Sequence, residues 1–354
     1  MLNVQCSMFN AQCSMFNVQC SMFNAQCSML TCGRACSRSA MLKLAYHCSR
    51  SIAAFNVQCS MFNAQCSMFN NMKKVITLLL LALSLSAQAG KIVTDTIESK
   101  VLGEKVVYNI YLPNGFDRSV KQYPVVYLLH GLSDDYSAWR EKGRMQDVAD
   151  ELIESGEAKE MIIVMPNAGG PDTHNTWNGY FNMPGWNYED FFFQEFIPAV
   201  EKKYRGVGDK GHRAVMGLSM GGGGSTVYCQ RHPDMFSSCY AMSAWLDNQS
   251  NNVGGGQQQK DKLYYVCEAV KEHSALQFVE QADEETKAKL RTVKWFFDCG
   301  DDDFLFDLSV RLHQLMRNAR IKDELRIRNG VHNWEYWHQA LRMALPFASR
   351  NFDS

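Results

Sequence analysis

The chain has 354 residues, of which 36 are Lys or Arg and 37 are Asp or Glu, so its net charge is −1 with neutral histidines. This balance leaves no basic stripe and gives no support to nucleic-acid binding. Hydrophobic residues make up 46% of the chain, which is enough for a large buried core.

The first 71 residues differ in kind from the rest. A seven-residue unit of Asn, Val or Ala, Gln, Cys, Ser, Met and Phe recurs at residues 3–9, 10–16, 17–23, 56–62 and 63–69. The units lack the charged e and g positions of a coiled coil. We therefore interpret residues 1–71 as a low-complexity repeat outside the native protein, translated from a nucleotide repeat upstream of the true start.

Residues 72–89 have the pattern of a secretory signal peptide. Lys73 and Lys74 precede the apolar stretch 75–85, and Ala87-Gln88-Ala89 is a small-residue cleavage site. The apolar stretch is shorter than the ~20 residues that a membrane span requires. The sequence predicts export to a periplasm or to the outside, and a mature chain that begins near Gly90 and has no membrane span.

Nine of the thirteen cysteines lie within the first 71 residues. The other four are Cys229, Cys239, Cys267 and Cys299, and no pair of them has Cys-x-x-Cys spacing. A metal site is therefore not expected. An exported protein could pair these thiols, and the sequence leaves their pairing open.

From about residue 123 onward, apolar runs of strand length alternate with helical patterns. This order predicts an α/β domain over residues 90–354, with a mostly parallel sheet covered by helices on both faces. Residues 92–101 and 105–112 are predicted to form an antiparallel hairpin at its edge. A strand at 124–129, a helix at 138–155 and a strand at 161–165 follow.

Residues 171–187 are rich in Asn, Gly, Pro and Trp, which predicts a long surface loop near the carboxyl end of the sheet. Trp177 and Trp186 of this loop, and Trp334 farther along, are candidates for an aromatic platform that binds an acyl group or a sugar. Core packing is the alternative role for each. Residues 188–205 resume a helical pattern.

Gly217-Leu218-Ser219-Met220-Gly221 follows the apolar run 212–216 and precedes three further glycines. Strand, turn and helix in this order are the setting of a nucleophile elbow, which presents a serine hydroxyl on a sharp turn. The glycines let the helix approach the strand without a Cβ clash. Ser219 is therefore the candidate nucleophile.

A serine that attacks a carbonyl group also needs N–H donors for the oxyanion. His130-Gly131-Leu132 closes the strand at 124–129, so the amide of Leu132 is expected to lie opposite that of Met220. These two amides are the predicted oxyanion hole. His130 is expected to support the turn and not to transfer protons.

Residues 245–290 are interpreted as an insertion over the site, because the segment is too short to hold its own core. The next strand, 293–297, runs into a cluster of carboxylates that includes Asp298, Asp301, Asp302 and Asp303. A triad acid is expected between the serine and the histidine in chain order. A solvated turn or a calcium site is the alternative, although the spaced ligands of an EF-hand loop are absent.

A short strand at 325–328 leads into Asn329-Gly330-Val331-His332. Of the nine histidines, only His332 follows both the serine and the carboxylates on a loop at a strand end. It is therefore the candidate general base.

These motifs, in this order, resemble the esterase family of the α/β-hydrolase superfamily, which contains feruloyl and acetylxylan esterases, S-formylglutathione hydrolases and mycolyl transferases. The resemblance covers residues 101–352 and rests on the segments 127–131, 188–191, 217–222, 300–303 and 330–334. It implies an α/β-hydrolase fold with Ser219 as nucleophile and His332 as base. The family pattern has its acid three residues after the glycine of the turn, which is Asp303 here; neighbouring Asp302 stays open as the alternative.

The resemblance further implies a serine esterase that works through an acyl-enzyme and needs no metal or organic cofactor. For an exported member, the expected substrate is a small-molecule or polysaccharide ester, such as a feruloyl or acetyl group on xylan. Two alternatives stay open: an acyltransferase that uses a sugar or lipid alcohol, and an inactive carbohydrate-binding homologue. The oligomeric state is not determined.

Overall fold

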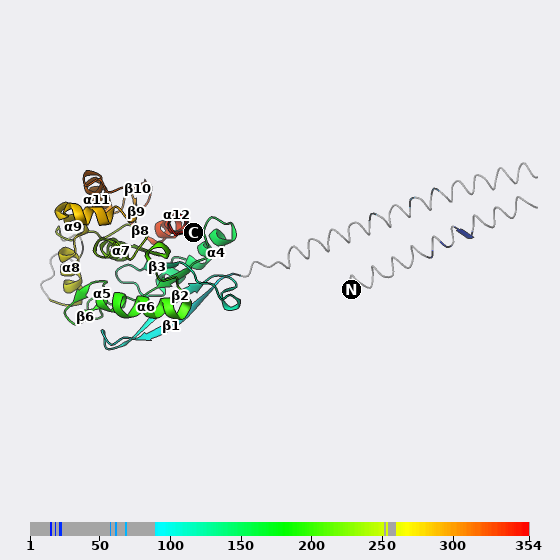
Figure 1. The fold of residues 1–354 in the computed structure, drawn as a ribbon, viewed down its shortest axis with the longest axis horizontal. Helices are drawn as coiled ribbons and strands as arrows, with labels where there is room; N and C mark the ends of the chain where they lie inside the picture. Colours follow the sequence, from blue (N-terminus) through cyan, green and yellow to red (C-terminus); the bar gives the residue numbers. More distant parts are fainter. Residues whose placement is uncertain are drawn as a thin grey trace, which may run out of the picture. The chain divides into compact units, whose positions relative to one another are not determined.

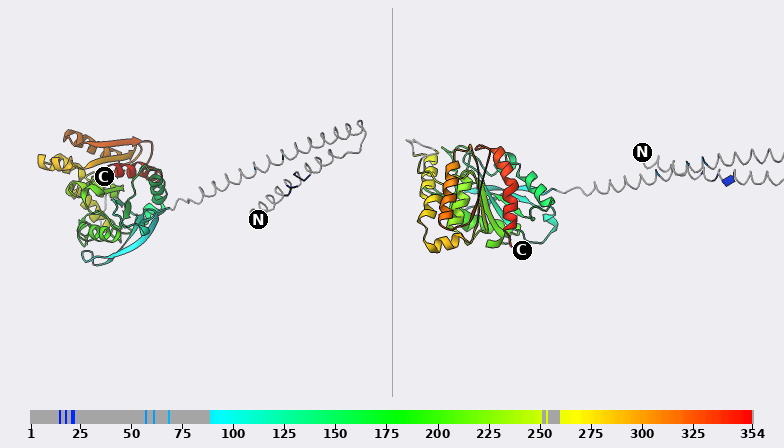
Figure 2. Two further views of the ribbon diagram at one scale, coloured as in Figure 1. Left: turned by 45° about the vertical axis from the view of Figure 1, so that its right-hand side comes forward. Right: turned by 90° about the horizontal axis from the view of Figure 1, so that it is seen from above.

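A sheet of eight strands forms the centre of residues 88–354 in a computed structural model, with helices on both sides (Figures 1 and 2). The structure describes residues 89–250, 253 and 260–353, and the isolated positions 15, 18, 21, 22, 57, 61 and 68. Apart from these positions and Ala89, the predicted repeat and signal peptide lie outside the described residues. Residues 88–354 form a unit of their own.

The sheet has the strand order β1-β2-β4-β3-β7-β8-β9-β10. Its strands are β1 (Lys91–Glu98), β2 (Lys105–Leu112), β3 (Val125–Leu129), β4 (Ile162–Met165), β7 (Arg213–Leu218), β8 (Ser238–Met242), β9 (Lys294–Gly300) and β10 (Asp323–Arg328). Strands β1 and β2 pair antiparallel at one edge, β2 pairs antiparallel with β4, and all other neighbours are parallel. The predicted edge hairpin and the mostly parallel sheet are confirmed.

Helices and short elements connect the strands. They are η1 (Phe116–Arg118), α3 (Ala138–Glu141), α4 (Met145–Glu154), the hairpin β5 (Asn182–Met183) and β6 (Trp186–Asn187), α5 (Tyr188–Asp190), the π-helical segment η2 (Phe191–Phe196), α6 (Ile197–Tyr204), η3 (Lys210–His212), α7 (Met220–Arg231), α8 (Lys262–Glu272), α9 (Ala275–Gln281), α10 (Glu284–Leu290), α11 (Phe306–Asn318) and α12 (Trp334–Arg350). The segment that was predicted as an insertion contains α8, α9 and α10. Its description as an insertion stays a prediction.

The single helix predicted at 138–155 is wrong, because the chain breaks it between α3 and α4. Arg144 has a φ of 48°, in the left-handed region. A Cβ added to Gly143 would lie 2.7 Å from the Trp139 ring and 3.1 Å from the Trp334 ring. Trp334 lies far along the chain, so the close approach of Gly143 to its ring is a tertiary contact, and the helical pattern of apolar residues did not reveal it.

Alternate residues of each central strand enter two separate apolar clusters. Val125, Tyr127 and Leu129 of β3 belong to the first cluster, which includes side chains from α6, α7, α9 and α11. Val126 and Leu128 belong to the second, which includes side chains from α4 and α12. Because successive side chains of a strand point to opposite faces, the sheet is buried on both sides. This accounts for the continuous apolar runs of its strands.

The order of the strands places the candidate site. The chain passes from β3 outward to β4 and then returns across β3 to β7, so the strand order reverses between β3 and β7. In doubly wound sheets, ligands bind outside the carboxyl ends of the strands at such a reversal. The turns after β3 and β7 meet at this point.

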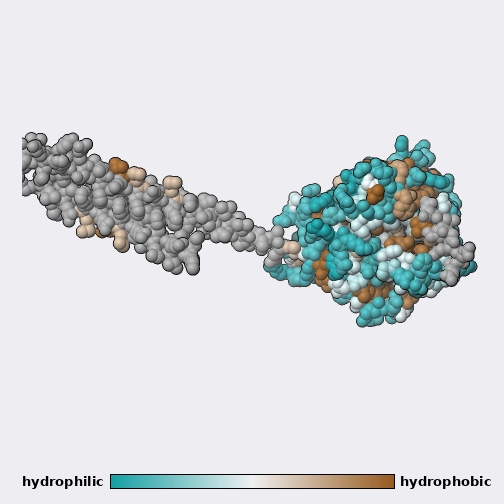
Figure 3. Space-filling view, turned by 180° about the vertical axis from the view of Figure 1, so that it is seen from behind, coloured by the Kyte–Doolittle hydropathy of each residue, from teal (hydrophilic) through white to brown (hydrophobic). Residues whose placement is uncertain are grey.

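Three further observations concern the whole unit. Among the described residues, no helix is long and apolar enough to cross a membrane. One face of the unit is mainly hydrophilic, with scattered hydrophobic residues (Figure 3). The four thiols whose pairing the sequence left open, Cys229, Cys239, Cys267 and Cys299, are free and buried.

Candidate active site

Ser219 lies on the sharp turn between β7 and α7, with φ 52° and ψ −117°. A non-glycine residue in this region costs about 1–3 kcal/mol, and such residues gather at functional sites. The conformation is held by hydrogen bonds from the Ser219 amide to the Met242 carbonyl and from the Trp245 amide to the Ser219 carbonyl. The strand-to-helix setting predicted for the elbow is present.

Glycine is required where α7 passes β3. A Cβ added to Gly221 would lie 2.5 Å from the carbonyl oxygens of both Leu129 and His130. These are backbone atoms of β3 and the turn after it, and they cannot move aside without displacing the strand. Gly221 therefore lets the first turn of α7 lie against β3, which brings the Ser219 turn next to the turn that carries Leu132.

A continuous chain of hydrogen bonds joins the three predicted triad residues. Nε2 of His332 lies 3.0 Å from Oγ of Ser219, and its Nδ1 lies 2.9 Å from Oδ2 and 3.0 Å from Oδ1 of Asp303. An ionised carboxylate only accepts hydrogen bonds, so Nδ1 must carry the imidazole proton. Nε2 is then free to accept the proton of the serine hydroxyl.

The Asp303 carboxyl has a lowered pKa, which favours its ionised form, although its side chain is fully buried. Burial opposes ionisation, but hydrogen bonds from His332, the Leu305 amide and the Ser243 hydroxyl outweigh it and lower the pKa of the Asp303 carboxyl. Asp302 is exposed, and its backbone amide donates to the Gly330 carbonyl. Of the two candidate acids, Asp303 is the one whose carboxylate contacts the imidazole.

The sequence did not single out two residues that contact the candidate triad. Ser243, directly after β8, has a φ of 46°, and its Oγ accepts a hydrogen bond of 3.0 Å from Nε1 of Trp337. The Trp337 ring lies edge-on to His332, with 4.9 Å between ring centroids. The only sequence signals are the position of Ser243 at a strand end and of Trp337 in the helix after His332.

The turn after β3 lies beside the elbow, as predicted for the oxyanion hole. A Cβ added to Gly131 would lie 2.6 Å from Cδ1 of Leu218 and 3.6 Å from Cβ of Ser219. Leu132 follows directly. Met220 is the first residue of α7, a position whose amide has no acceptor within the helix. The two turns therefore meet at the serine.

His130 supports this turn from inside the protein. Its side chain is buried, and burial lowers the pKa of its imidazole. Nδ1 lies 2.9 Å from the Gly131 carbonyl, to which it donates. Nε2 accepts a hydrogen bond of 3.0 Å from the Ala168 amide. Both ring nitrogens are thus used by the neutral imidazole to tie the turn after β3 to the turn after β4.

The three predicted platform tryptophans differ in their surroundings. Trp186 is only 6% exposed and donates to the Gly179 carbonyl, so it leaves little surface for a ligand and its predicted platform role is not retained. Half-buried Trp177 stacks on Trp186. Trp334 packs against Trp139 in the second apolar cluster.

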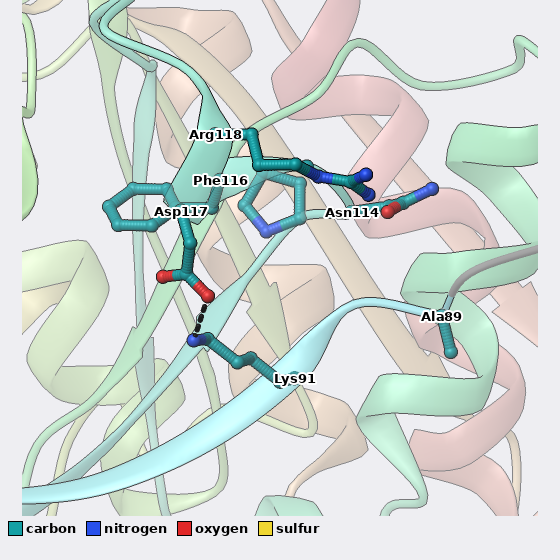
Figure 4. Close-up of a pocket in the computed structure, with 8 residues that line it drawn as sticks. Ala89, Lys91, Asn114, Phe116, Asp117 and Arg118 are labelled. Atoms are coloured by element: carbon teal, nitrogen blue, oxygen red, sulfur yellow. Dashed lines mark hydrogen bonds and ion pairs between the residues drawn. The ribbon is translucent and has the colours of Figure 1, made fainter.

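A separate hollow of about 330 Å³ is lined by none of these residues (Figure 4). It is lined by Ala89, Lys91, Asp117 and the residues 113–116 and 118. Lys91 and Asp117 form an ion pair within it. Strand β2 runs antiparallel to β4, so the end of β2 lies where the parallel strands begin, and the triad lies at their opposite ends.

Comparisons with known proteins show the family and the fold of this chain. The model of the Esterase family, described as "Putative esterase", matches residues 99–348. A solved structure of a ferulic acid esterase is 52% identical with a TM-score of 0.70, over 75% of this chain and 99% of that one. An S-formylglutathione hydrolase from Staphylococcus aureus, 20% identical over 73% of this chain and 99% of that one, shares the fold with a TM-score of 0.60.

The curated relatives are longer than the region they share with this chain. An endo-1,4-beta-xylanase/feruloyl esterase of Xylanibacter ruminicola is 33% identical over 151 residues, which are 42% of this chain and 20% of that protein. The chain thus spans about a fifth of that relative. Given the match over residues 99–348 and the esterase with 52% identity, the chain belongs to the Esterase family of α/β-hydrolases.

Proposed function

We propose that the protein hydrolyses feruloyl esters of plant cell-wall polysaccharide through an acyl-enzyme, with Ser219 as nucleophile, His332 as general base and Asp303 as the acid of the triad. The observation that carries the proposal is the hydrogen-bond chain from Asp303 through His332 to Ser219. The 52% identity to a ferulic acid esterase supports the choice of acyl group.

In the first step, Oγ of Ser219 attacks the ester carbonyl while Nε2 of His332 takes its proton. The amides of Leu132 and Met220 donate hydrogen bonds to the oxyanion that forms. Asp303 stabilises the imidazolium and holds the ring in position. The tetrahedral intermediate then collapses: the bond to the alcohol oxygen breaks, and His332 returns its proton to the leaving alcohol.

In the second step, water attacks the acyl group on Ser219, again with His332 as the base. The bond to Oγ breaks, the acid leaves, and the proton returns to the serine. The proton balance closes within the triad and the substrates, so neither step calls for a metal or an organic cofactor.

The acyl group is tested by comparing methyl ferulate, methyl acetate and p-nitrophenyl acetate as substrates. We expect kcat/KM for methyl ferulate to exceed that for methyl acetate at least about tenfold, the discrimination that ~1.4 kcal/mol of differential transition-state binding provides. Methyl acetate carries the same alcohol, so the comparison isolates the acyl group. Preference for methyl acetate would instead indicate a deacetylase, and no cleavage of any of the three would favour the inactive homologue.

Acyl transfer to an alcohol is the second candidate. A diacylglycerol acyltransferase/mycolyltransferase of Mycobacterium avium is 25% identical over 62% of this chain and 68% of that protein. The two reactions share the acyl-enzyme and differ in the acceptor that attacks it. Product analysis with an added sugar or lipid alcohol separates them, since a transferase forms the new ester in preference to the free acid.

We also propose export with cleavage before Gly90, on the basis of the sequence pattern at 72–89. The backbone nitrogen of Gly90 lies 2.8 Å from Oδ1 of Asp150, and the carbonyl of Gly90 accepts a hydrogen bond from Gln146. Cleavage at this point would turn the amide into an ammonium group beside a carboxylate, a favourable pair. N-terminal sequencing of the exported protein should begin at Gly90; a start before Met72 would contradict both the cleavage and the interpretation of residues 1–71.

A further inference from the structure

Phe304 is an exposed aromatic residue beside the triad. Its side chain is 59% exposed, whereas the flanking Asp303 and Leu305 are 4% and 0% exposed. No other Phe, Tyr or Trp side chain among the described residues of 89–353 is exposed rather than buried or half-buried. Its ring centroid lies 4.6 Å from that of His332. A single exposed apolar side chain needs no explanation, so the position of this one carries the argument.

The backbone that carries Phe304 is held by the triad acid itself. The Leu305 amide donates to Oδ1 of Asp303 at 2.9 Å, and the Phe306 amide donates to the Asp303 carbonyl at 2.9 Å. The neighbouring loop is tied to the same turn, because the Asp302 amide donates to the Gly330 carbonyl. Phe304 is therefore presented at a set position beside His332 and needs no packing partner to hold its backbone.

The strand order determines which part of an ester would meet this ring. Phe304 follows β9, and Leu132 follows β3, and these two strands lie on opposite sides of β7. The carbonyl oxygen of the substrate points to the Leu132 and Met220 amides. The leaving alcohol must lie within hydrogen-bond reach of Nε2 of His332, which returns its proton. A ring beside the imidazole, away from the oxyanion turn, thus faces the alcohol.

We propose that Phe304 forms the subsite for the leaving alcohol and favours a sugar there, such as the pentose of a feruloylated polysaccharide. The C–H groups of a sugar face carry partial positive charge and pack against the electron-rich face of an aromatic ring. An exposed, backbone-held ring offers that face without prior rearrangement. This inference rests on the proposed function and adds the specificity for the alcohol to it.

The experiment compares two ferulate esters that differ only in the alcohol, methyl ferulate and O-feruloyl arabinose. The measured quantity is the ratio of kcat/KM for the arabinose ester to kcat/KM for the methyl ester. Phe304→Ala is expected to lower this ratio about fivefold to tenfold, the size of one aromatic contact. Phe304→Tyr, which keeps an aromatic ring, should leave this ratio near the wild-type value. Met343→Ala, which removes an exposed apolar side chain on α12, is the matched control and should leave the ratio at the wild-type value.

Two results would overturn the inference. If Phe304→Ala lowers kcat/KM equally for both esters, the ring only positions His332, which acts on every substrate. If it lowers neither, the ring contacts nothing in the transition state. Failure of the proposed function is a separate result, because that function concerns the acyl group. If the wild-type protein cleaves no ferulate, the ratio is measured with acetylated arabinose and methyl acetate instead. The outcomes described above then decide whether Phe304 contacts the alcohol.

Discussion

Ser219→Ala is expected to lower kcat for methyl ferulate by about 10⁶-fold, the effect of removing the nucleophile from a serine triad. Alanine leaves the amides of Leu132 and Met220 in place, so a residual acceleration of about 10³–10⁴-fold over water should remain. The measurement is the hydrolysis rate at saturating ester, with enough enzyme to detect the residual rate.

The folded state of this variant should be preserved. Alanine at φ 52° is strained to a similar degree as serine, so the free energy of unfolding in urea should change little. Ser225→Ala is the matched control. Ser225 is buried in α7, the helix that follows Ser219, and donates only to the Gly221 carbonyl at 2.7 Å, so this variant should keep its activity. Substantial turnover by Ser219→Ala would mean that another group attacks the ester.

Asp303→Asn is expected to lower kcat by about 10⁴-fold, whereas Asp302→Asn should have little effect. The side-chain amide that Asp303→Asn introduces would donate to Nδ1 of His332, which places the imidazole proton on Nε2. That nitrogen, 3.0 Å from Oγ of Ser219, could then no longer accept the serine proton. The pair is well matched, since both variants remove one negative charge from adjacent positions.

A comparison of kcat and of thermal unfolding for the two variants decides the assignment. A large loss of kcat in Asp302→Asn with little loss in Asp303→Asn would move the acid by one residue. Equal losses in both would point to the charge of the loop as a whole. Either result would contradict the assignment of Asp303 as the acid, which rests on its contact with His332.

Local patterns sufficed to locate the serine and the histidine. A serine flanked by glycines after a buried strand predicts a nucleophile elbow, because that turn leaves no room for a Cβ at positions such as Gly221. His332 was identified because it follows the last short strand in chain order. Asp303 was identified from the family resemblance, since from residue types alone the neighbouring carboxylates were equivalent.

The residues that contact the candidate triad could not be predicted from local patterns in the same way. Ser243 and Trp337 are separated by 94 positions and meet through one hydrogen bond, and neither belongs to a local pattern. The split between α3 and α4 has the same origin, because Gly143 closely approaches the ring of Trp334, which lies far along the chain. The tryptophans show the same limit of prediction from sequence. Three of them were predicted to form a binding platform, but packing buries Trp186 and leaves Phe304 exposed beside His332.

By itself the sequence determined the order of strands and helices, the elbow at Ser219, the candidate base and the family to which the chain belongs. These features depend on short-range periodicity and on backbone geometry that few residue types allow. Only the tertiary structure decided which carboxylate meets His332, which aromatic residues stay exposed and which side chains hold the imidazole. Each of those depends on contacts between segments far apart in the chain, and a contact of that kind leaves no periodic trace in either segment.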